Sequence, residues 1–345
     1  MTITRLKFRK SYTAIYAAIA VALLILTILN LILGSVIIPP GELLASLTGS
    51  EAPKYVNDIL WNFRIPKVIT ALLAGVALSV CGLQMQTMFR NPLADPFILG
   101  ISSGAGLGVA LFVMGSSAFG LSIAGGLFFN LGIAASAWAG AAGVTLIILL
   151  VSHRLRENSS LLIFGIMIGS VTSAIITLIQ YFSSSSELKA FVTWTMGSFS
   201  GLTNSQIWIL SLLVVPGIVL SVYNIKELNI LLQGEAYAKS LGLNLQATRR
   251  RILIATTLLA GSVTAFCGPI GFIGIAVPHI ARLFFKNADH KVLVPATALT
   301  GAAIMVLTDM VAQLPGQSWV IPINTVSALI GVPVILFIIM RSKFS

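Results

Sequence analysis

Side chains that could carry out chemistry are few in this sequence and stand far apart. The three histidines, His153, His279 and His290, are scattered along the chain, and Cys81 and Cys267 each fall inside a run of apolar residues. Metal sites need several ligands at short, regular spacing, and nucleophilic catalysis needs a base beside the nucleophile. Because neither pattern is present, the sequence predicts no metal site, no cofactor, no catalytic residue and no enzymatic activity for this chain.

The segment 234–242 comes closest to a nucleotide-binding motif. Phosphate-binding loops follow a strand and carry a glycine directly before their Lys-Ser pair, whereas Ala238 stands there in this sequence and no strand is expected. The segment has the character of a short amphipathic helix that ends at a glycine. It is therefore predicted to dock a partner, with a helix lying on lipid as the alternative. Its residues are Gly234, Glu235, Ala236, Tyr237, Ala238, Lys239, Ser240, Leu241 and Gly242.

A polar hairpin, Asn-Pro-Leu-Ala-Asp-Pro at 91–96, separates two apolar runs. Proline fixes φ and restricts the residue before it, so Pro92 and Pro96 make this hairpin stiffer than an ordinary loop. Gly100, Gly104 and Gly108 follow at intervals of four and share one stripe of a helix, where a neighbouring backbone can approach closely. The pattern predicts a rigid polar tip between closely packed helices, and a turn that only reverses the chain is the alternative.

The elements that hold these features are predicted to be membrane helices. Of the 345 residues, 57% are hydrophobic and only 9% are charged, whereas soluble domains carry roughly 25% charged residues. Apolar runs of about 20 residues recur along the whole length, as membrane-spanning helices require. The first run, 12–34, is too long for the core of a signal peptide. The sequence therefore predicts an all-α polytopic membrane protein.

Ten apolar segments are predicted, and the charges between them set their orientation. The segments span 12–34, 65–88, 97–115, 124–151, 160–182, 206–223, 252–267, 271–285, 292–312 and 323–340. Four basic residues, Lys54, Arg64, Lys67 and Lys189, lie on one side of this arrangement, and subtracting them from 21 leaves 17 on the side of both termini. Basic residues collect on the cytoplasmic side, so both termini are predicted to be cytoplasmic.

This topology makes the chain a single transmembrane domain, 1–345, that contains one long cytoplasmic segment, 224–251. The net charge of +11 is explained by the orientation and by contact with anionic lipid headgroups. Nucleic acid is therefore not expected as a partner.

Asp309 is the carboxylate expected at membrane depth, in the ninth segment. An ionisable group inside a membrane is a candidate for function, here as a proton site. No Glu, His or Lys is expected beside it on a neighbouring helix. A structural role is therefore favoured, and a proton-driven secondary transporter that uses Asp309 is kept as the alternative function.

The motifs together resemble the FecCD-type permeases, the membrane subunits of ABC importers for ferric siderophores, haem and cobalamin. The resemblance lies in Gly82-x-x-x-Gln86 with the hairpin and Leu99-Gly100, in Arg64-Ile65-Pro66-Lys67, in 234–242, and in Gly268-Pro-Ile-Gly-Phe-Ile-Gly with Pro278-His279-Ile280-Ala281-Arg282. These motifs cover nearly the whole chain in the family's order. The resemblance implies ten helices per subunit, in a homodimer or pseudo-dimer with two ATPase subunits on the cytoplasmic side and a binding protein outside.

The resemblance also implies roles for residues on the cytoplasmic side. The family's cytoplasmic gate corresponds to Asn91 and Leu93 in the hairpin, and a second part of the gate corresponds to Ser159 and Ser160. The segment 234–242 corresponds to the coupling helix that enters a cleft on the ATPase, and ATP and Mg²⁺ are bound by that partner.

On the external side the resemblance assigns Arg64 and Lys67 to basic positions that receive acidic residues of the binding protein. Lys67 stands where the family commonly has a second arginine; it keeps the charge but loses bidentate pairing. Gln313 stands where a third basic position is sometimes found, so the docking geometry there differs. The segment 187–196 resembles the short external helices that close the outer mouth.

The function implied is ATP-driven import by alternating access across the inner membrane of a bacterium. ATP binding would bring the two ATPase subunits together and rock the permease pair between outward-open and inward-open states. The cargo would pass as a chelate, because no residue pattern in this chain coordinates a metal. The pore-lining residues do not distinguish a ferric siderophore from haem or cobalamin.

Overall fold

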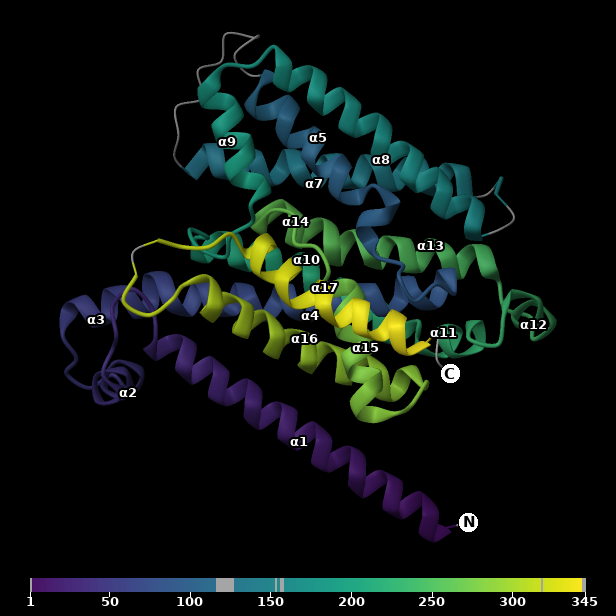
Figure 1. The fold of residues 1–345 in the computed structure, drawn as a ribbon, viewed down its shortest axis with the longest axis horizontal. Coiled ribbons are helices and arrows are strands. Elements are labelled where there is room, and N and C mark those ends of the chain that lie inside the picture. The colour runs from purple at the N-terminus through teal and green to yellow at the C-terminus, as the bar shows by residue number, and fades with distance from the viewer. Residues whose placement is uncertain (1, 116–126, 153, 156–157, 318, 343–345) are drawn as a thin grey trace.

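The structure, a computed structural model, describes residues 2–115, 127–152, 154–155, 158–317 and 319–342, and this part of the chain contains helices and no strand (Figure 1). The helices long enough to span a membrane are α1 (Thr2–Ile32), α4 (Ile65–Phe89), α7 (Leu127–Ser152), α8 (Asn158–Tyr181), α10 (Asn204–Tyr223), α13 (Leu245–Thr256) continued by α14 (Ser262–Cys267), and α16 (His290–Ala312). Three further apolar helices are α5 (Ile101–Val113), α15 (Ile273–Phe285) and α17 (Ile323–Ser342), of which α17 counts as an apolar helix only over Ile323–Ile338.

The remaining helices are short and lie between these. They are α2 (Pro40–Thr48), α3 (Lys54–Ile59), α9 (Ser185–Thr195), α11 (Ile225–Leu231) and α12 (Glu235–Ser240). Single turns continue or connect helices: η1 (Leu60–Arg64) joins α3 to α4, η2 (Pro96–Leu99) precedes α5, and η3 (Thr257–Gly261) joins α13 to α14.

Over its described residues, each of the ten predicted apolar segments coincides with one of these helices or a continuous pair of helices, which confirms an all-α membrane protein with several spans. Residues 124–126 of the fourth segment lie outside the described part of the chain. Seven of the helices meet the length and hydropathy expected of a span, and three are shorter. The number of crossings stays a prediction. One boundary differs clearly, because α13 begins at Leu245, inside the segment predicted to be a cytoplasmic loop.

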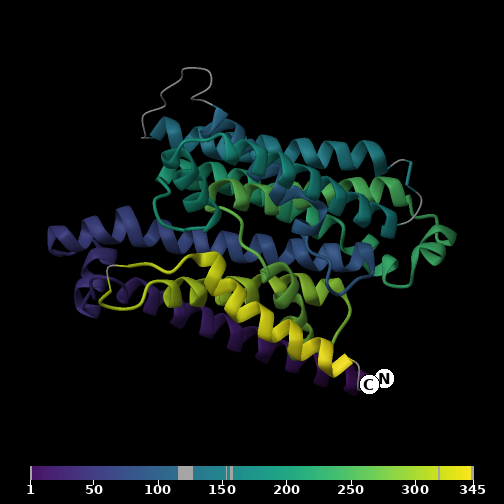
Figure 2. The ribbon, with the colours of Figure 1, turned by 45° about the horizontal axis from the view of Figure 1, so that its top comes forward.

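Helix α4 lies at the centre of the molecule, between a layer with α5, α7 and α8 and a layer with α1, α16 and α17 (Figures 1 and 2). Its surface is almost wholly buried from Ala74 to Phe89. Small residues permit this, because Gly75 faces the backbone of Gly301 on α16 and Gly82 faces that of Gly274 on α15. Close backbone approach at small residues is how membrane helices gain packing energy, since lipid is as apolar as the helices.

The glycine stripe predicted after the hairpin is confirmed for Gly104 and Gly108, which both face α7, whereas Gly100 precedes α5 and is not part of the stripe. A Cβ added at Gly104 would lie 2.6 Å from the Gly140 carbonyl oxygen, and one at Gly108 would meet the backbone of Ser136, both on α7. Gly100, at φ 77°, instead lies against Gly165 and Gly169 of α8. The three glycines therefore allow close contacts with two neighbouring helices.

The bundle has two distinct ends. Helices α11 and α12 lie at one end together with the start of α1 and the end of α17, and α2, α3 and α9 lie at the other (Figures 1 and 2). Following the charge-based prediction, we call these the cytoplasmic end and the external end. The hairpin belongs to the cytoplasmic end, because α4 enters at Ile65 from the external helices and finishes at Phe89.

Candidate functional site

The hairpin after α4 is closed by its own hydrogen bonds. Arg90 adopts a left-handed conformation with φ 48°, which ends α4. Asn91 Oδ1 accepts a hydrogen bond from the Leu93 amide at 2.9 Å, and Asn91 O accepts one from the Ala94 amide at 3.1 Å. Leu93 is 37% exposed at the tip. The hairpin therefore presents an apolar side chain on a stiff polar turn.

Helix α15 holds this hairpin from the side. Gln86, near the end of α4, donates to the carbonyl oxygens of Gly274 and Ile275 at 3.3 and 3.2 Å and accepts from Arg282 at 2.7 Å. His279 Nε2 lies 2.9 Å from the Pro92 carbonyl oxygen, to which its N–H donates. Because these bonds reach both the helix and the tip, α15 ties the hairpin to α4.

Asp95 caps the turn η2 from inside the hairpin. It is 3% exposed, and its Oδ1 accepts a hydrogen bond from the Phe97 amide at 2.9 Å. Burial raises the pKa of the Asp95 carboxyl to about 6, although the Phe97 hydrogen bond lowers it. The usual pKa of an aspartate is about 4. The folded protein therefore binds the proton more tightly than the unfolded chain does.

This shift predicts how stability depends on pH. Because the native pKa lies above the unfolded one, the stability is greatest below about pH 4 and falls as the pH rises through about 6. Between about pH 5 and pH 7 the loss should be on the order of 1 kcal/mol. Asp95→Asn should remove this dependence of stability on pH. Thermal unfolding of the detergent-purified protein at pH 5 and pH 7 measures it. An equal pH dependence in the variant and the wild type would contradict the assignment.

Helix α12 protrudes from the cytoplasmic end (Figure 1). Glu235, at its first turn, pairs with Arg249 of α13 at 2.8 Å, and Ala238 is fully buried against the bundle. Tyr237 and Leu241 are 52% and 56% exposed. One face of this helix is thus fixed to the bundle. The other offers two large apolar side chains four residues apart, Tyr237 in the helix and Leu241 at its C-cap, which share a face.

A hydrogen-bond network connects the neighbouring α11 to the cytoplasmic end of α4. Asn229 of α11 accepts from the His290 amide at 2.9 Å and donates to Asp289 at 2.7 Å. The His290 ring lies 2.8 Å from Asn229 Oδ1 through Nδ1 and 2.8 Å from Thr87 Oγ1 through Nε2. His290 is 1% exposed. The network therefore links the α11–α12 segment, the start of α16 and the turn of α4 that precedes the hairpin.

Arg90 makes a second link between the hairpin and α12. A Cβ added to Gly234, the residue before α12, would lie 3.3 Å from Arg90 Nη1. Gly234 has φ 104°, a conformation that side chains rarely adopt. The first residue after α4 thus lies against the first residue before α12.

Ser159 and Ser160 lie in the first turn of α8, where Ser159 is exposed and Ser160 is half-buried. Helix α8 packs along η2, which follows the hairpin. Their assignment to a second part of the gate stays a prediction, as does that of Asn91 and Leu93.

At the external end Arg64 and Lys67 are both largely buried in intramolecular contacts. The Arg64 guanidinium donates to the carbonyl oxygens of Leu31 and Val36, and the residue is 8% exposed. These acceptors are neutral, so they hold the side chain without cancelling its charge. Docking of a binding protein at Arg64 and Lys67 remains a prediction. Both side chains are largely buried at the external end.

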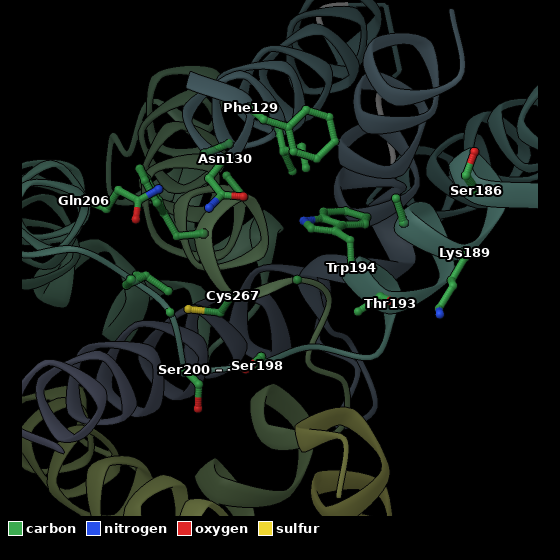
Figure 3. A pocket seen from close by; sticks show the side chains of 18 residues that line it. Phe129, Asn130, Ser186, Lys189, Thr193, Trp194, Ser198, Ser200, Gln206 and Cys267 are labelled. Atoms are coloured by element: carbon green, nitrogen blue, oxygen red, sulfur yellow. Dashed lines mark hydrogen bonds between the residues drawn. The ribbon is translucent and has the colours of Figure 1, made fainter. Parts of the chain in front are cut away.

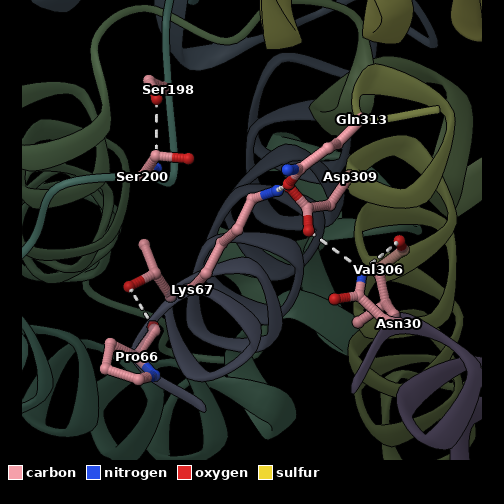
Figure 4. Close-up of polar contacts among 9 residues, drawn as sticks. Asn30, Pro66, Lys67, Ser198, Ser200, Val306, Asp309 and Gln313 are labelled. Atoms are coloured by element: carbon pink, nitrogen blue, oxygen red, sulfur yellow. Dashed lines mark hydrogen bonds and ion pairs between the residues drawn. The ribbon is translucent and has the colours of Figure 1, made fainter. Parts of the chain in front are cut away.

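The expectation that Asp309 has no Lys beside it on a neighbouring helix is wrong. Lys67 Nζ lies 3.0 Å from Asp309 Oδ1, and Asn30 of α1 donates to Asp309 Oδ2 at 2.9 Å (Figure 4). Gln313 Oε1 accepts from Lys67 at 2.5 Å. Residues 67 and 309 are far apart in the sequence, and only the packing of α4 against α16 brings them together. The pair supplies the basic partner whose expected absence favoured a structural role, so the role of Asp309 stays a prediction.

A cavity of about 540 Å³ also lies at the external end, beside α9 (Figure 3). Phe129 and Asn130 of α7, Trp194 of α9, Gln206 of α10 and Cys267 of α14 are among its lining residues. The cavity separates α9 from the bundle over part of its length. This leaves α9 less tightly packed than α4.

Several residues that bond at the cytoplasmic end were given no role by the sequence, although Gln86 belongs to the motif that resembles the FecCD family. These are Gln86, Thr87, Arg90, Asn229 and His290. A polar residue in the last turn of an apolar run is the signal that could have found Gln86 and Thr87. Asn229 and His290 carry no such signal, because their pairing depends on how α11 meets α16.

Comparisons with known proteins agree along the whole chain. The model of the FecCD transport family matches residues 22–341. The vitamin B12 import system permease protein BtuC of Salmonella arizonae is 36% identical over 326 residues, which is 94% of this chain and 93% of that one. BtuC of Klebsiella pneumoniae is 34% identical over 343 residues, 99% of this chain and 98% of that one.

A solved structure described as an inward-facing metal-chelate type ABC transporter superposes with a TM-score of 0.82 at 27% identity, covering 96% of this chain and 99% of that one. The helix arrangement and the sequence thus point the same way. Because the family match extends over residues 22–341 and relatives above 30% identity cover the chain almost completely, this protein belongs to the FecCD transport family of ABC importer permeases.

Proposed function

We propose that this chain is the membrane-spanning subunit of an ATP-driven importer, paired with a second permease subunit in the cytoplasmic membrane of a bacterium. Two ATPase subunits would bind at its cytoplasmic end, and a soluble binding protein would bind at its external end. The observation that carries the proposal is the exposed apolar face of α12, at the end of a family permease where the hairpin also lies. A permease driven by ion gradients has no need of such a face.

The cargo that we propose is a metal chelate of the cobalamin, ferric siderophore and haem class. The relatives at 34% and 36% identity are named as vitamin B12 permeases, and the solved neighbour as a metal-chelate transporter. Cobalamin is therefore the first cargo to test. Among the described residues no group of three or more His, Cys, Asp or Glu could hold a metal ion, which fits a cargo that travels as an intact chelate.

The contacts at the cytoplasmic end support a route by which an ATPase bound at α12 would move the proposed gate. Movement of α12 would reach the hairpin directly through Arg90, which lies against Gly234. It would also reach α4 through α11 and the Asn229–His290–Thr87 bonds. Two prolines stiffen the hairpin, so its tip follows the helices that carry it.

Reconstitution tests the proposal. The chain is incorporated into proteoliposomes with its co-expressed ATPase, and radiolabelled cobalamin, a ferric siderophore or haem is supplied with the soluble binding protein. Uptake should require ATP, the ATPase and the binding protein together. Uptake that follows a proton gradient without ATP would instead support the alternative that uses Asp309.

The gate assignment makes a separate prediction about Leu93. In a background of Cys81→Ala and Cys267→Ala, which removes two buried thiols, Leu93→Cys should form a disulfide between the two permease subunits in one nucleotide state and far less in another. A disulfide requires Cα atoms within about 7 Å, so the yield reports closure. Non-reducing gels with and without ATP measure it.

Two comparisons make the crosslinking result decisive. Lys291→Cys, which is exposed elsewhere at the cytoplasmic end, should give the same low yield in every state. An intact dimer in which Leu93→Cys never crosslinks would show that the hairpin is an ordinary turn.

A further inference from the structure

Lys67 lies at the centre of a charge cluster that ties three helices together at the external end. Its ammonium meets Asp309 of α16 at 3.0 Å and Gln313 at 2.5 Å, while Asn30 of α1 holds the other Asp309 oxygen (Figure 4). The Lys67 side chain is 11% exposed and that of Asp309 is 1% exposed. The cluster is thus a buried ion pair with its cation nearer to the surface.

Two cavities meet at Lys67. The larger, about 410 Å³, is lined by Arg64 and Lys67 together with neutral residues that include Asn62, Thr203 and Gln313, and no carboxylate of the described residues lines it. The smaller, about 150 Å³, is lined by both Lys67 and Asp309 and by the 196–200 connection between α9 and α10. Lys67 therefore faces both cavities, whereas Asp309 lines the smaller one.

The larger cavity is complementary to an incoming carboxylate. Arg64 bonds only to carbonyl oxygens among its described contacts, so its charge is not cancelled by an anion. Lysine is a compact charge on a flexible stem with three rotatable donors, whereas arginine is a rigid fork. A lysine at this position can exchange one carboxylate partner for another by turning its stem, and Arg64 stays in place.

We propose that an acidic side chain of the soluble binding protein enters this cavity and that Lys67 exchanges Asp309 for it. The inference rests on the proposed function, because it requires a binding protein. Removing one partner of a buried pair is costly, so the exchange raises the energy of the Asp309 site and makes a change in the surrounding contacts favourable. Lys67 is then a positioning residue: when it binds the docked protein, it breaks an ion pair inside the permease.

The 196–200 connection, which lines the same cavity as Asp309, is where the surrounding contacts would change. Its Ser198 amide donates to the Cys267 carbonyl oxygen at 2.9 Å, and Met196 O accepts from the Asn324 amide at 3.2 Å. These bonds join the end of α9 to α14 and to the start of α17. Loss of the ion pair next to them would loosen α9, beside which lies the 540 Å³ cavity.

Association kinetics of the reconstituted importer with its soluble cobalamin-binding protein test the exchange. Lys67→Met should slow association roughly tenfold at low salt, and the effect should shrink as salt is added. Asp309→Asn should accelerate it several-fold, because Lys67 no longer has an internal anion to leave. In the Lys67→Met background, Asp309→Asn should have no further effect, since the pair acts as a unit.

Matched variants distinguish the effect of the exchange on the association rate from the effect of a change in net charge. Asp58→Asn removes an exposed external carboxylate and Lys54→Met an exposed external cation, so both change the net charge by the same amounts without touching the cluster. Each should alter the rate far less than its counterpart. Gln313→Glu supplies a competing carboxylate beside Lys67 without disturbing the buried residues, and it should slow association even if Asp309→Asn is poorly folded.

The outcomes distinguish the exchange from the docking that it presupposes. If Lys67→Met slows association while Asp309→Asn and Gln313→Glu behave like the wild type, docking stands and the exchange is overturned. The exchange is also overturned if Asp58→Asn accelerates association as much as Asp309→Asn. If neither Lys67→Met nor the double reversal of Arg64 and Lys67 to Glu alters association, the docking proposal itself fails.

Discussion

Placing negative charge on the exposed face of α12 is expected to abolish ATP-driven uptake by this permease. Tyr237 and Leu241 are 52% and 56% exposed, although α12 is otherwise fixed to the bundle by Ala238 and by the Glu235–Arg249 pair. The few large side chains that anchor an interface at its centre cost about 2–4 kcal/mol each when they are removed. Tyr237→Glu with Leu241→Glu should therefore weaken ATPase binding at least a hundredfold, on the order of 3 kcal/mol.

Copurification of the ATPase and ATP-dependent uptake in proteoliposomes measure this effect. Gln246→Glu is the matched control, because it adds a negative charge at an exposed position of the same cytoplasmic segment, and it should retain both. Glu235 is a poor probe of the interface, since its replacement would also break the ion pair with Arg249. If the double variant still copurifies with the ATPase in full, α12 does not form the contact with the ATPase.

Gly82→Val should have the largest effect on folding. A Cβ at position 82 would lie 2.5 Å from the Gly274 Cα, closer than non-bonded carbon atoms approach, and the obstacle is backbone that no rotamer change can remove. Helices α4 and α15 would have to separate, which would also break the Gln86 bonds to Gly274 and Ile275. We expect a loss of at least about 3 kcal/mol, seen as a low yield of monodisperse protein and a lowered melting temperature.

Gly143→Val is the matched control for this substitution. Gly143 lies in a membrane-length helix, α7, and a Cβ there would meet nothing within 4 Å. The same chemical change should therefore leave the yield and the melting temperature near those of the wild type. Equal behaviour of the two variants would mean that the close approach of α4 and α15 does not limit stability.

The sequence by itself determined the features that depend on local composition. Apolar runs of helical length predicted the membrane helices, because lipid leaves the backbone no other way to satisfy its hydrogen bonds. The interval-four glycines of α5 predicted a close approach, because a helix repeats its faces every three to four residues. Pro92 and Pro96 predicted a stiff hairpin from their own ring geometry. The motifs were sufficient to identify the resemblance to the FecCD family, which the comparisons confirm.

Tertiary structure alone decided which polar side chains meet. Lys67 and Asp309 are separated by most of the chain, and their 3.0 Å contact depends on the rotation and depth of α4 against α16. The same holds for Asn229 with His290. Hydrophobic periodicity fixes which face of a helix is apolar, but a membrane helix that is apolar all round carries no such mark. Rotation is then set by close packing at small residues such as Gly75 against Gly301, and only the assembled bundle shows which charges that packing brings together.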